Sequence, residues 1–182
     1  KMGLSRYLID RILRDWTCRC DAIYLFANDS VLHYYPKFGF VEAQEFCTGL
    51  HVTARAAPVR KLDMSDVGDI AILHRHYLRS NPFSALSMTD NWGLVMFHCT
   101  SLLKGFVYYV EDCQAVVIAS QDQGSLKILD IYGGENADLA GVIGAIINTS
   151  GFSSKVRLGF SLKNTACESL YPHCEEDTTL FI

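Results

Sequence analysis

Apolar residues recur at three- and four-residue spacing at the start of the chain, and they predict an amphipathic helix from about Leu4 to Trp16. Its other face carries Arg6, Asp10, Arg11, Arg14 and Asp15. The continuous apolar run from Ala22 to Ala27 follows, and it has the length and composition of a strand that is buried on both faces.

The next segment has strong helix-start and helix-stop signals. Asn28-Asp29-Ser30 supplies N-cap residues, so we expect a short helix through about Tyr35 that Pro36 and Gly39 end. Phe40 to Val52 then reads as one or two strands.

The remaining chain predicts a mixture of helices and strands, and hence an α/β fold with a mixed sheet. Small residues from Thr53 to Pro58 make the best candidate linker. After it we expect, in order, a strand at Val59–Leu62, a helix capped by Ser65-Asp66, a helix over Asp90–Leu103, strands at Phe106–Glu111, Gln114–Ser120 and Leu126–Tyr132, a helix over about Ala137–Asn148 and a strand near Val156–Leu162.

A short internal repeat divides the chain. An apolar strand ends in Asn28 and is followed seven positions later by Tyr35-Pro36, and the same arrangement recurs 136 positions on at Asn164 and Tyr171-Pro172. The elements before the second copy have no counterpart before Lys1. We therefore predict that residues 1–52 are the rear half of one module and residues 53–182 a complete second one. The alternative is a chance match in which both tyrosines only pack.

Charge and cysteine content exclude several classes of protein. With 16 Lys and Arg against 20 Asp and Glu, the net charge is −4, which argues against a nucleic-acid partner. Seven cysteines cannot all pair within one chain and lack zinc-site spacing, so we expect reduced thiols, a cytoplasmic location and no metal. Charged residues interrupt the apolar stretches of the first 20 residues, and no apolar run has the roughly 20 residues that a bilayer requires, so we expect no membrane partner.

Two motifs in residues 1–52 resemble those of the GNAT (GCN5-related) N-acetyltransferase superfamily. Gly3-Leu4-Ser5-Arg6 leads into a helix as in the phosphate motif Q/R-x-x-G-x-G/A, and Asn28 is followed by Tyr35-Pro36-Lys37-Phe38-Gly39-Phe40, as in the later Asn-to-Tyr signature. Ser5 stands where the family has a second Gly or Ala, and the Gln or Arg that opens the motif would precede Lys1.

The resemblance implies a function and a set of site residues. Gly3, Leu4, Ser5 and Arg6 would cradle the pyrophosphate of acetyl-CoA, because a helix N-terminus has unpaired N–H groups and partial positive charge. Asn28 would contact the pantetheine arm. Tyr35 would be the general acid that protonates the departing thiolate as a small-molecule or peptide amine attacks the thioester. The general base is not identified, and His98 and Asp130 are not distinguished by spacing.

The second module departs from the family pattern. Glu135 and Asp138 stand in its equivalent loop, where like charge opposes phosphate binding, and they suit an ordinary helix start instead. We therefore expect a GNAT-like module that does not bind coenzyme A. Two alternatives stay open, namely a non-catalytic GNAT-like interaction or regulatory module, and an assembly in which a partner chain or another protomer of a homo-oligomer supplies the missing half.

Overall fold

The computed structural model describes residues 3–122, 124–151, 154–163, 169–173 and 178–182. The chain forms two compact units, which are described separately. Unit 1 comprises residues 1–46 and 172–182, and unit 2 comprises residues 47–171. The chain passes between them within strands β2 (Glu45–His51) and β8 (Ser169–His173). The predicted boundary between residues 52 and 53 refers to repeated modules, not to compact units, and it stays a prediction.

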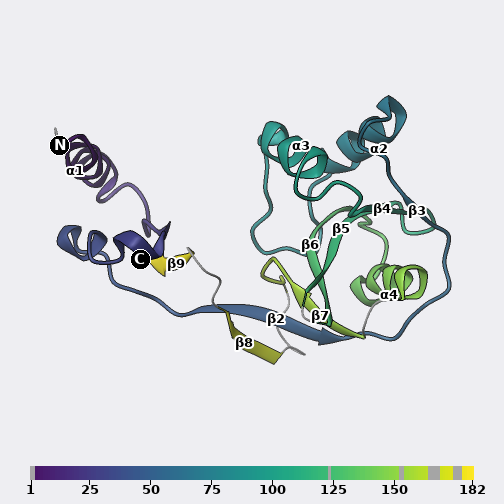
Figure 1. The fold of residues 1–182 in the computed structure, drawn as a ribbon. Helices are drawn as coiled ribbons and strands as arrows, with labels where there is room; N and C mark the ends of the chain where they lie inside the picture. Colours follow the sequence, from purple (N-terminus) through teal and green to yellow (C-terminus); the bar gives the residue numbers. More distant parts are fainter. Residues whose placement is uncertain (1–2, 123, 152–153, 164–168, 174–177) are drawn as a thin grey trace. The chain divides into compact units, whose positions relative to one another are not determined.

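Unit 2 is built on a mixed seven-stranded sheet with the order β3-β4-β5-β6-β7-β2-β8 (Figure 1). Strands β6 and β7 are parallel, with Ile128 opposite Leu158, whereas β3 to β6 pair antiparallel in sequence order. The bounds of its remaining strands are β3 (Val59–Lys61), β4 (Val107–Val110), β5 (Ala115–Asp122), β6 (Ser125–Gly133) and β7 (Lys155–Leu158). The expected α/β fold with a mixed sheet is confirmed.

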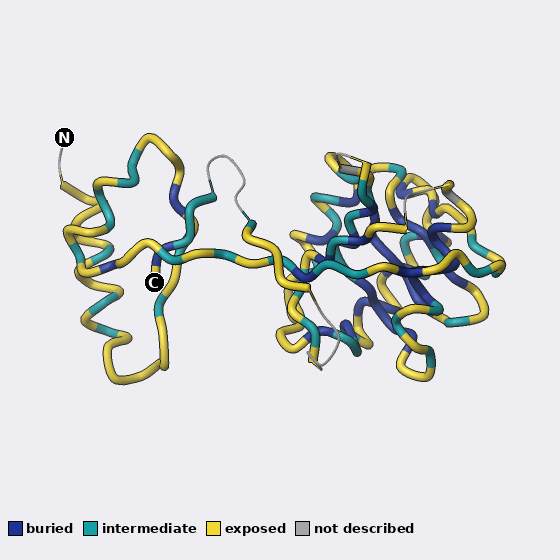
Figure 2. Tube along the Cα trace, turned by 90° about the horizontal axis from the view of Figure 1, so that it is seen from below, coloured by how far each residue is buried: buried dark blue, intermediate teal, exposed yellow. Residues whose placement is uncertain are grey.

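Successive side chains of β5 point to opposite faces of this sheet and belong to two different cores. Ala115 and Val117 belong to the core under helix α4 (Leu139–Ser150), and Val116 and Ile118 belong to the core under helices α2 (Val67–Tyr77) and α3 (Trp92–Thr100). A strand that is covered on both faces reads as a continuous apolar run, which is why this segment was predictable. Figure 2 shows the concentration of buried residues in unit 2.

Unit 1 has a small core. Helix α1 (Leu4–Trp16) begins and ends where the spacing predicts, but it contains no buried residue. Its half-buried Ile9 and Leu13 pack against a cluster of Ala27, Phe40 and Phe181. The bounds of the other elements are β1 (Leu25–Ala27), the 3-10 helices η1 (Asp29–Val31) and η2 (Tyr35–Phe38), and β9 (Thr179–Phe181), which pairs antiparallel with β1.

The expectation of a strand over residues 22–27 that is buried on both faces is wrong. Strand β1 starts at Leu25, and Tyr24 and Phe26 are 66% and 51% exposed. Within the described residues β1 pairs with β9 alone, and the cluster covers only the face that carries Leu25 and Ala27. An apolar run shows which residues could be buried, and the covering elements decide which are.

The second copy of the repeat differs from the first at its tyrosine. Tyr35 begins the 3-10 helix η2, whereas Tyr171 lies within strand β8. A Cβ atom placed on Gly49 of β2 would lie 2.3 Å from the Tyr171 ring, so this glycine leaves the room that the ring occupies. Asn164, the other marker of the second copy, lies outside the described residues. The tandem arrangement therefore stays a prediction.

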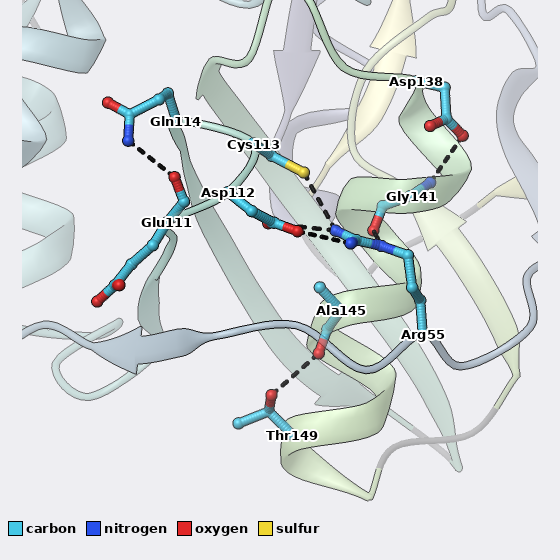
Figure 3. A network of polar contacts seen from close by, with 9 residues as sticks. All are labelled: Arg55, Glu111, Asp112, Cys113, Gln114, Asp138, Gly141, Ala145 and Thr149. Atoms are coloured by element: carbon cyan, nitrogen blue, oxygen red, sulfur yellow. Dashed lines mark hydrogen bonds and ion pairs between the residues drawn. The ribbon is translucent and has the colours of Figure 1, made fainter.

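The predicted linker, residues 53–58, has no regular structure but is fastened to helix α4 (Figure 3). The Arg55 backbone N–H donates to the Gly144 carbonyl oxygen at 2.9 Å, and Arg55 Nε donates to the Gly141 carbonyl oxygen at 3.0 Å. Its guanidinium also pairs with both carboxylate oxygens of Asp112, at 2.6 and 3.3 Å. This pairing lowers the pKa of Asp112. The segment is therefore held against α4 within unit 2 by hydrogen bonds and an ion pair.

In the part of the chain that the structure describes, none of the helices combines the length and the apolar character that crossing a bilayer requires. Nor does any group of three or more His, Cys, Asp or Glu residues there form a set that could hold a metal ion.

Candidate functional site

The opening turn of α1 has the local geometry of an anion site. Gly3 is its N-cap residue in the left-handed region, with φ of 69°, which glycine adopts without steric cost. The first intrahelical bond is donated by the Tyr7 N–H to the Gly3 carbonyl oxygen, so the N–H groups of Leu4, Ser5 and Arg6 have no partner within the helix. No acidic residue stands in this first turn, and no side chain caps it.

Arg6 connects this turn to the segment that carries Tyr35. Its guanidinium carbon lies 6.0 Å from the centre of the Phe38 ring, at the end of η2. The side chain is exposed and makes no ion pair with another described residue. A cation next to unpaired N–H groups strengthens the attraction for phosphate.

Asn28 is an N-cap residue, as its sequence context predicts. Its Oδ1 accepts hydrogen bonds from the Ser30 N–H at 3.0 Å and from the Ser30 hydroxyl at 2.5 Å, which starts η1. The two donors of its amide NH2 group make no hydrogen bond to another described residue. Within the described residues, no hydrogen bond or ring contact joins Asn28 to Tyr35 or to the opening turn of α1. A pantetheine contact stays a prediction.

Tyr35 is held by aromatic neighbours. Its half-buried ring lies 6.3 Å from Phe40 and 5.8 Å from Phe181, measured between ring centres, and 5.6 Å from the ring of Tyr34. Because Phe181 comes from the far end of the chain, no local sequence signal could have indicated this contact. The ring has a packing role, which says nothing against its hydroxyl as a proton donor.

The loop between β6 and α4, which the predicted repeat equates with the opening turn of α1, carries two acidic side chains that already have partners. Gly133 and Gly134 turn the chain after β6 with φ of 75° and 81°. Asp138 caps α4 by accepting from the Gly141 N–H at 2.8 Å, which confirms the prediction of an ordinary helix start. Glu135 makes a two-bond ion pair with Arg79, at 2.7 and 2.6 Å. Burial opposes the charged form of Glu135, but its own backbone N–H and Arg79 outweigh this and lower its pKa.

A buried polar pair joins the loop after α2 to strand β6. The Asn81 amide, 3% exposed, donates to the Asp130 carboxylate at 2.7 Å. Burial raises the pKa of Asp130, and the hydrogen bonds from Asn81, the Ile131 N–H and Tyr132 counteract it. The Asn81 Oδ1 in turn accepts from the N–H groups of Phe83 and Ser84. The pair fixes this loop, a role that the sequence did not indicate because the partners are 49 residues apart.

His76 lies beside Gly133, in the turn after β6, and is 1% exposed. A Cβ atom on Gly133 would lie 2.6 Å from His76 Nδ1, and the Tyr109 ring centre is 5.4 Å from that of His76. Neither ring nitrogen has a hydrogen-bond partner among the described residues. Burial, and then the charges of Arg75 and Arg79, lower the pKa of His76, while Glu135 acts in the opposite direction.

We expect the stability of the chain to fall as the pH is lowered from about 7 to 5. The folded-state pKa of His76 lies below the unfolded value of about 6.5, so the unfolded state binds the proton first and gains free energy. Urea unfolding at several pH values gives the free energy of unfolding at each pH. This free energy should fall less steeply with decreasing pH in His76→Leu than in the native chain. Leu73→Val, a buried change on the same helix without a titrating group, should keep the native slope. If His76→Leu kept the pH dependence of the native chain, protonation of His76 would not be the cause of that dependence.

Comparison with known proteins gives matches among solved structures. No family model matches the chain, and no curated protein matches it. A probable N-acyltransferase from Enterococcus faecalis V583 is 15% identical with a TM-score of 0.49, and Eis1 from Mycobacterium abscessus is 15% identical with a TM-score of 0.48. A GCN5-related N-acetyltransferase from Kribbella flavida is 14% identical with a TM-score of 0.46.

Each of these matches covers 99% of this chain but only 49%, 52% and 47% of the other one, so the chain spans about half the length of the structures that it resembles. At these identities and TM-scores the likeness does not extend to a substrate or a reaction.

Proposed function

We propose that the protein is an acetyl-CoA-dependent N-acetyltransferase in which unit 1 binds the cofactor. The observation that carries the proposal is the opening turn of α1, where a left-handed Gly3, N–H groups without a helical partner and Arg6 come together and no acidic residue stands in the first turn. This combination suits a pyrophosphate. The acceptor is an amine, either a small molecule or a peptide, and the chemistry needs no metal.

Each site residue has a defined task in this reaction. The backbone of Gly3 to Arg6 and the Arg6 guanidinium hold the phosphates, and the amide NH2 group of Asn28 donates to the pantetheine arm. The neutral amine attacks the thioester carbonyl, a C–N bond forms and the C–S bond breaks. The thiolate that leaves takes the proton of the Tyr35 hydroxyl, and the amine proton passes to solvent or to a base.

We further propose that residues 1–52 correspond to the rear half of a GNAT module and residues 53–182 to a second module that does not bind coenzyme A. The exposed apolar residues of α1, among them Leu4, Leu8 and Ile12, support the first part, since such a stripe suits a helix that is covered by further elements. The Glu135–Arg79 pair supports the second, because a phosphate would have to displace a carboxylate that is already bound.

A non-catalytic interaction or regulatory module is the second candidate. The ring contacts of Tyr35 with Phe40 and Phe181 favour it, since they give this tyrosine a role that does not involve its hydroxyl. The two candidates differ in whether acetyl-CoA binds and whether the phenol matters for turnover.

Titration calorimetry with acetyl-CoA tests the proposed function through two matched charge changes on one helix. Arg6→Gln should weaken binding by about fivefold to tenfold, because a guanidinium bound to phosphate contributes roughly 1–1.5 kcal/mol. Arg14→Gln removes the same charge from the last turn of α1 and should change the affinity by less than about twofold, since separated exposed charges are screened. Equal weakening in both variants, or no saturable heat with the native chain, would contradict the proposal.

A further inference from the structure

A shallow pocket of about 280 Å³ that is wide open to solvent, called the cavity below, lies in unit 1 between the end of α1 and the turn that follows η2. The buried Phe40 and the half-buried Leu13 and Ile23 supply apolar surface to it. The exposed Cys18, Cys20 and Asp21 supply polar atoms. Its volume is near the lower end of the range for small-molecule sites, roughly 300–1,000 Å³, so it suits a compact ligand.

The side chains that line this cavity bring negative charge to it. Among the described residues that line it, Asp21 alone has a charged side chain, and none of the ion pairs between described residues involves Asp21. Phe38 and Phe40 add aromatic rings, whose faces attract cations. The Arg6 guanidinium, which lies 6.0 Å from the centre of the Phe38 ring, shows one such ring beside a cation already. A carboxylate beside apolar and aromatic walls complements an organic cation.

We propose that this cavity binds a small organic ammonium ion with an apolar body. The ammonium group pairs with the Asp21 carboxylate, and the apolar body displaces water from Leu13, Ile23 and Phe40. The site is distinct from the opening turn of α1, since neither Gly3 nor Arg6 lines it. Binding here requires neither acetyl-CoA nor the Tyr35 hydroxyl, so it stands or fails independently of the proposed transferase activity.

The two thiols of the cavity report its occupancy. Cys18 and Cys20 are exposed, free thiols, and Cys113 of unit 2 is a half-buried free thiol outside the cavity. We would measure alkylation of each cysteine by iodoacetamide, by peptide mass spectrometry, with 2-phenylethylammonium at up to about 10 mM, since one exposed ion pair and a small apolar body give roughly millimolar affinity. We expect alkylation of Cys18 and Cys20 to be at least threefold slower and alkylation of Cys113 to be unchanged. A slowing of this size is roughly what the fraction of occupied molecules at this affinity allows.

Two comparisons show whether the charge matters. The uncharged isostere 2-phenylethanol should protect the thiols less, and Asp21→Asn should remove the advantage of the ammonium ion, whereas Asp10→Asn, an exposed change outside the cavity, should preserve it. Circular dichroism establishes that each variant is folded. Equal protection by the alcohol and the ammonium ion, protection that survives in Asp21→Asn, or no protection at all would overturn the proposal.

Discussion

Gly133→Ala is expected to lower the free energy of unfolding by about 2–5 kcal/mol, the largest change in stability that we foresee for a single methyl group. Its φ of 75° costs an L-residue roughly 1–2 kcal/mol. A Cβ atom there would also lie 2.6 Å from His76 Nδ1 and 2.7 Å from the Gln114 carbonyl oxygen, and overpacking of this kind costs about 1–3 kcal/mol. Urea unfolding that is followed by circular dichroism measures the difference.

Gly124→Ala separates the two contributions. Gly124 has a similar φ of 78°, but nothing lies within 4 Å of its Cβ position. Gly124→Ala should therefore lower the free energy of unfolding only by the backbone contribution, roughly 1–2 kcal/mol. If both variants lost the same amount, the packing of the β6–α4 turn against His76 and Gln114 would not be what makes Gly133 necessary.

Tyr35→Phe is expected to lower the acetylation rate by about 100-fold or more and to change the affinity for acetyl-CoA by less than about twofold. A general acid contributes roughly 10²–10⁴ to the rate, and the substitution removes only the proton donor. The phenyl ring keeps its contacts with Phe40 and Phe181, so the fold should be unaffected. Steady-state acetylation of a panel of amines gives the rate, and calorimetry gives the affinity.

Tyr34→Phe is the matched control for this prediction. Tyr34 is the adjacent phenol, and its ring packs against Phe38 at 5.1 Å between ring centres. Loss of its hydroxyl should leave turnover as in the native chain. If Tyr35→Phe also retained full turnover, Tyr35 would have a packing role only. If no activity were found at all, the non-catalytic candidate would be favoured.

The fold of unit 2 was predictable because its local signals agree with its tertiary structure. Asp66 and Asp138 both cap the helices that they were expected to start. Strand β5 covers the predicted run from Gln114 to Ser120 almost completely, because burial on both faces leaves an uninterrupted apolar segment. The predicted strand near Val156–Leu162 is shorter than expected, since β7 ends at Leu158.

Unit 1 was predictable only where one segment determines its own structure. The Leu4–Trp16 helix and the Asn28 cap follow from spacing and from a local side-chain bond. The exposure of Phe26 depends on which elements cover β1, and the neighbours of Tyr35 include Phe181, so neither could be inferred from nearby residues. Arg55 was missed for a related reason, since its partners Asp112 and Gly141 are distant in sequence.

The same distinction applies to the candidate site. The unpaired N–H groups after Gly3 are a local property that follows from the predicted start of the helix, whereas phosphate binding there stays a prediction. Glu135 in the second loop was recognised as unfavourable for phosphate, but its partner Arg79 lies 56 residues earlier and gave no signal. Local motifs therefore locate the start of a helix, and long-range contacts decide whether its N–H groups are available to a ligand.

Hydrogen-exchange mass spectrometry with and without acetyl-CoA tests the central claim most directly, because it compares both loops in one experiment. We expect acetyl-CoA to slow amide exchange in the opening turn, residues 4–6, where the N–H groups have no helical partner, and to leave residues 134–141 unchanged. Protection confined to residues 134–141, or none in either loop, would contradict the assignment of the opening turn of α1 as the cofactor cradle.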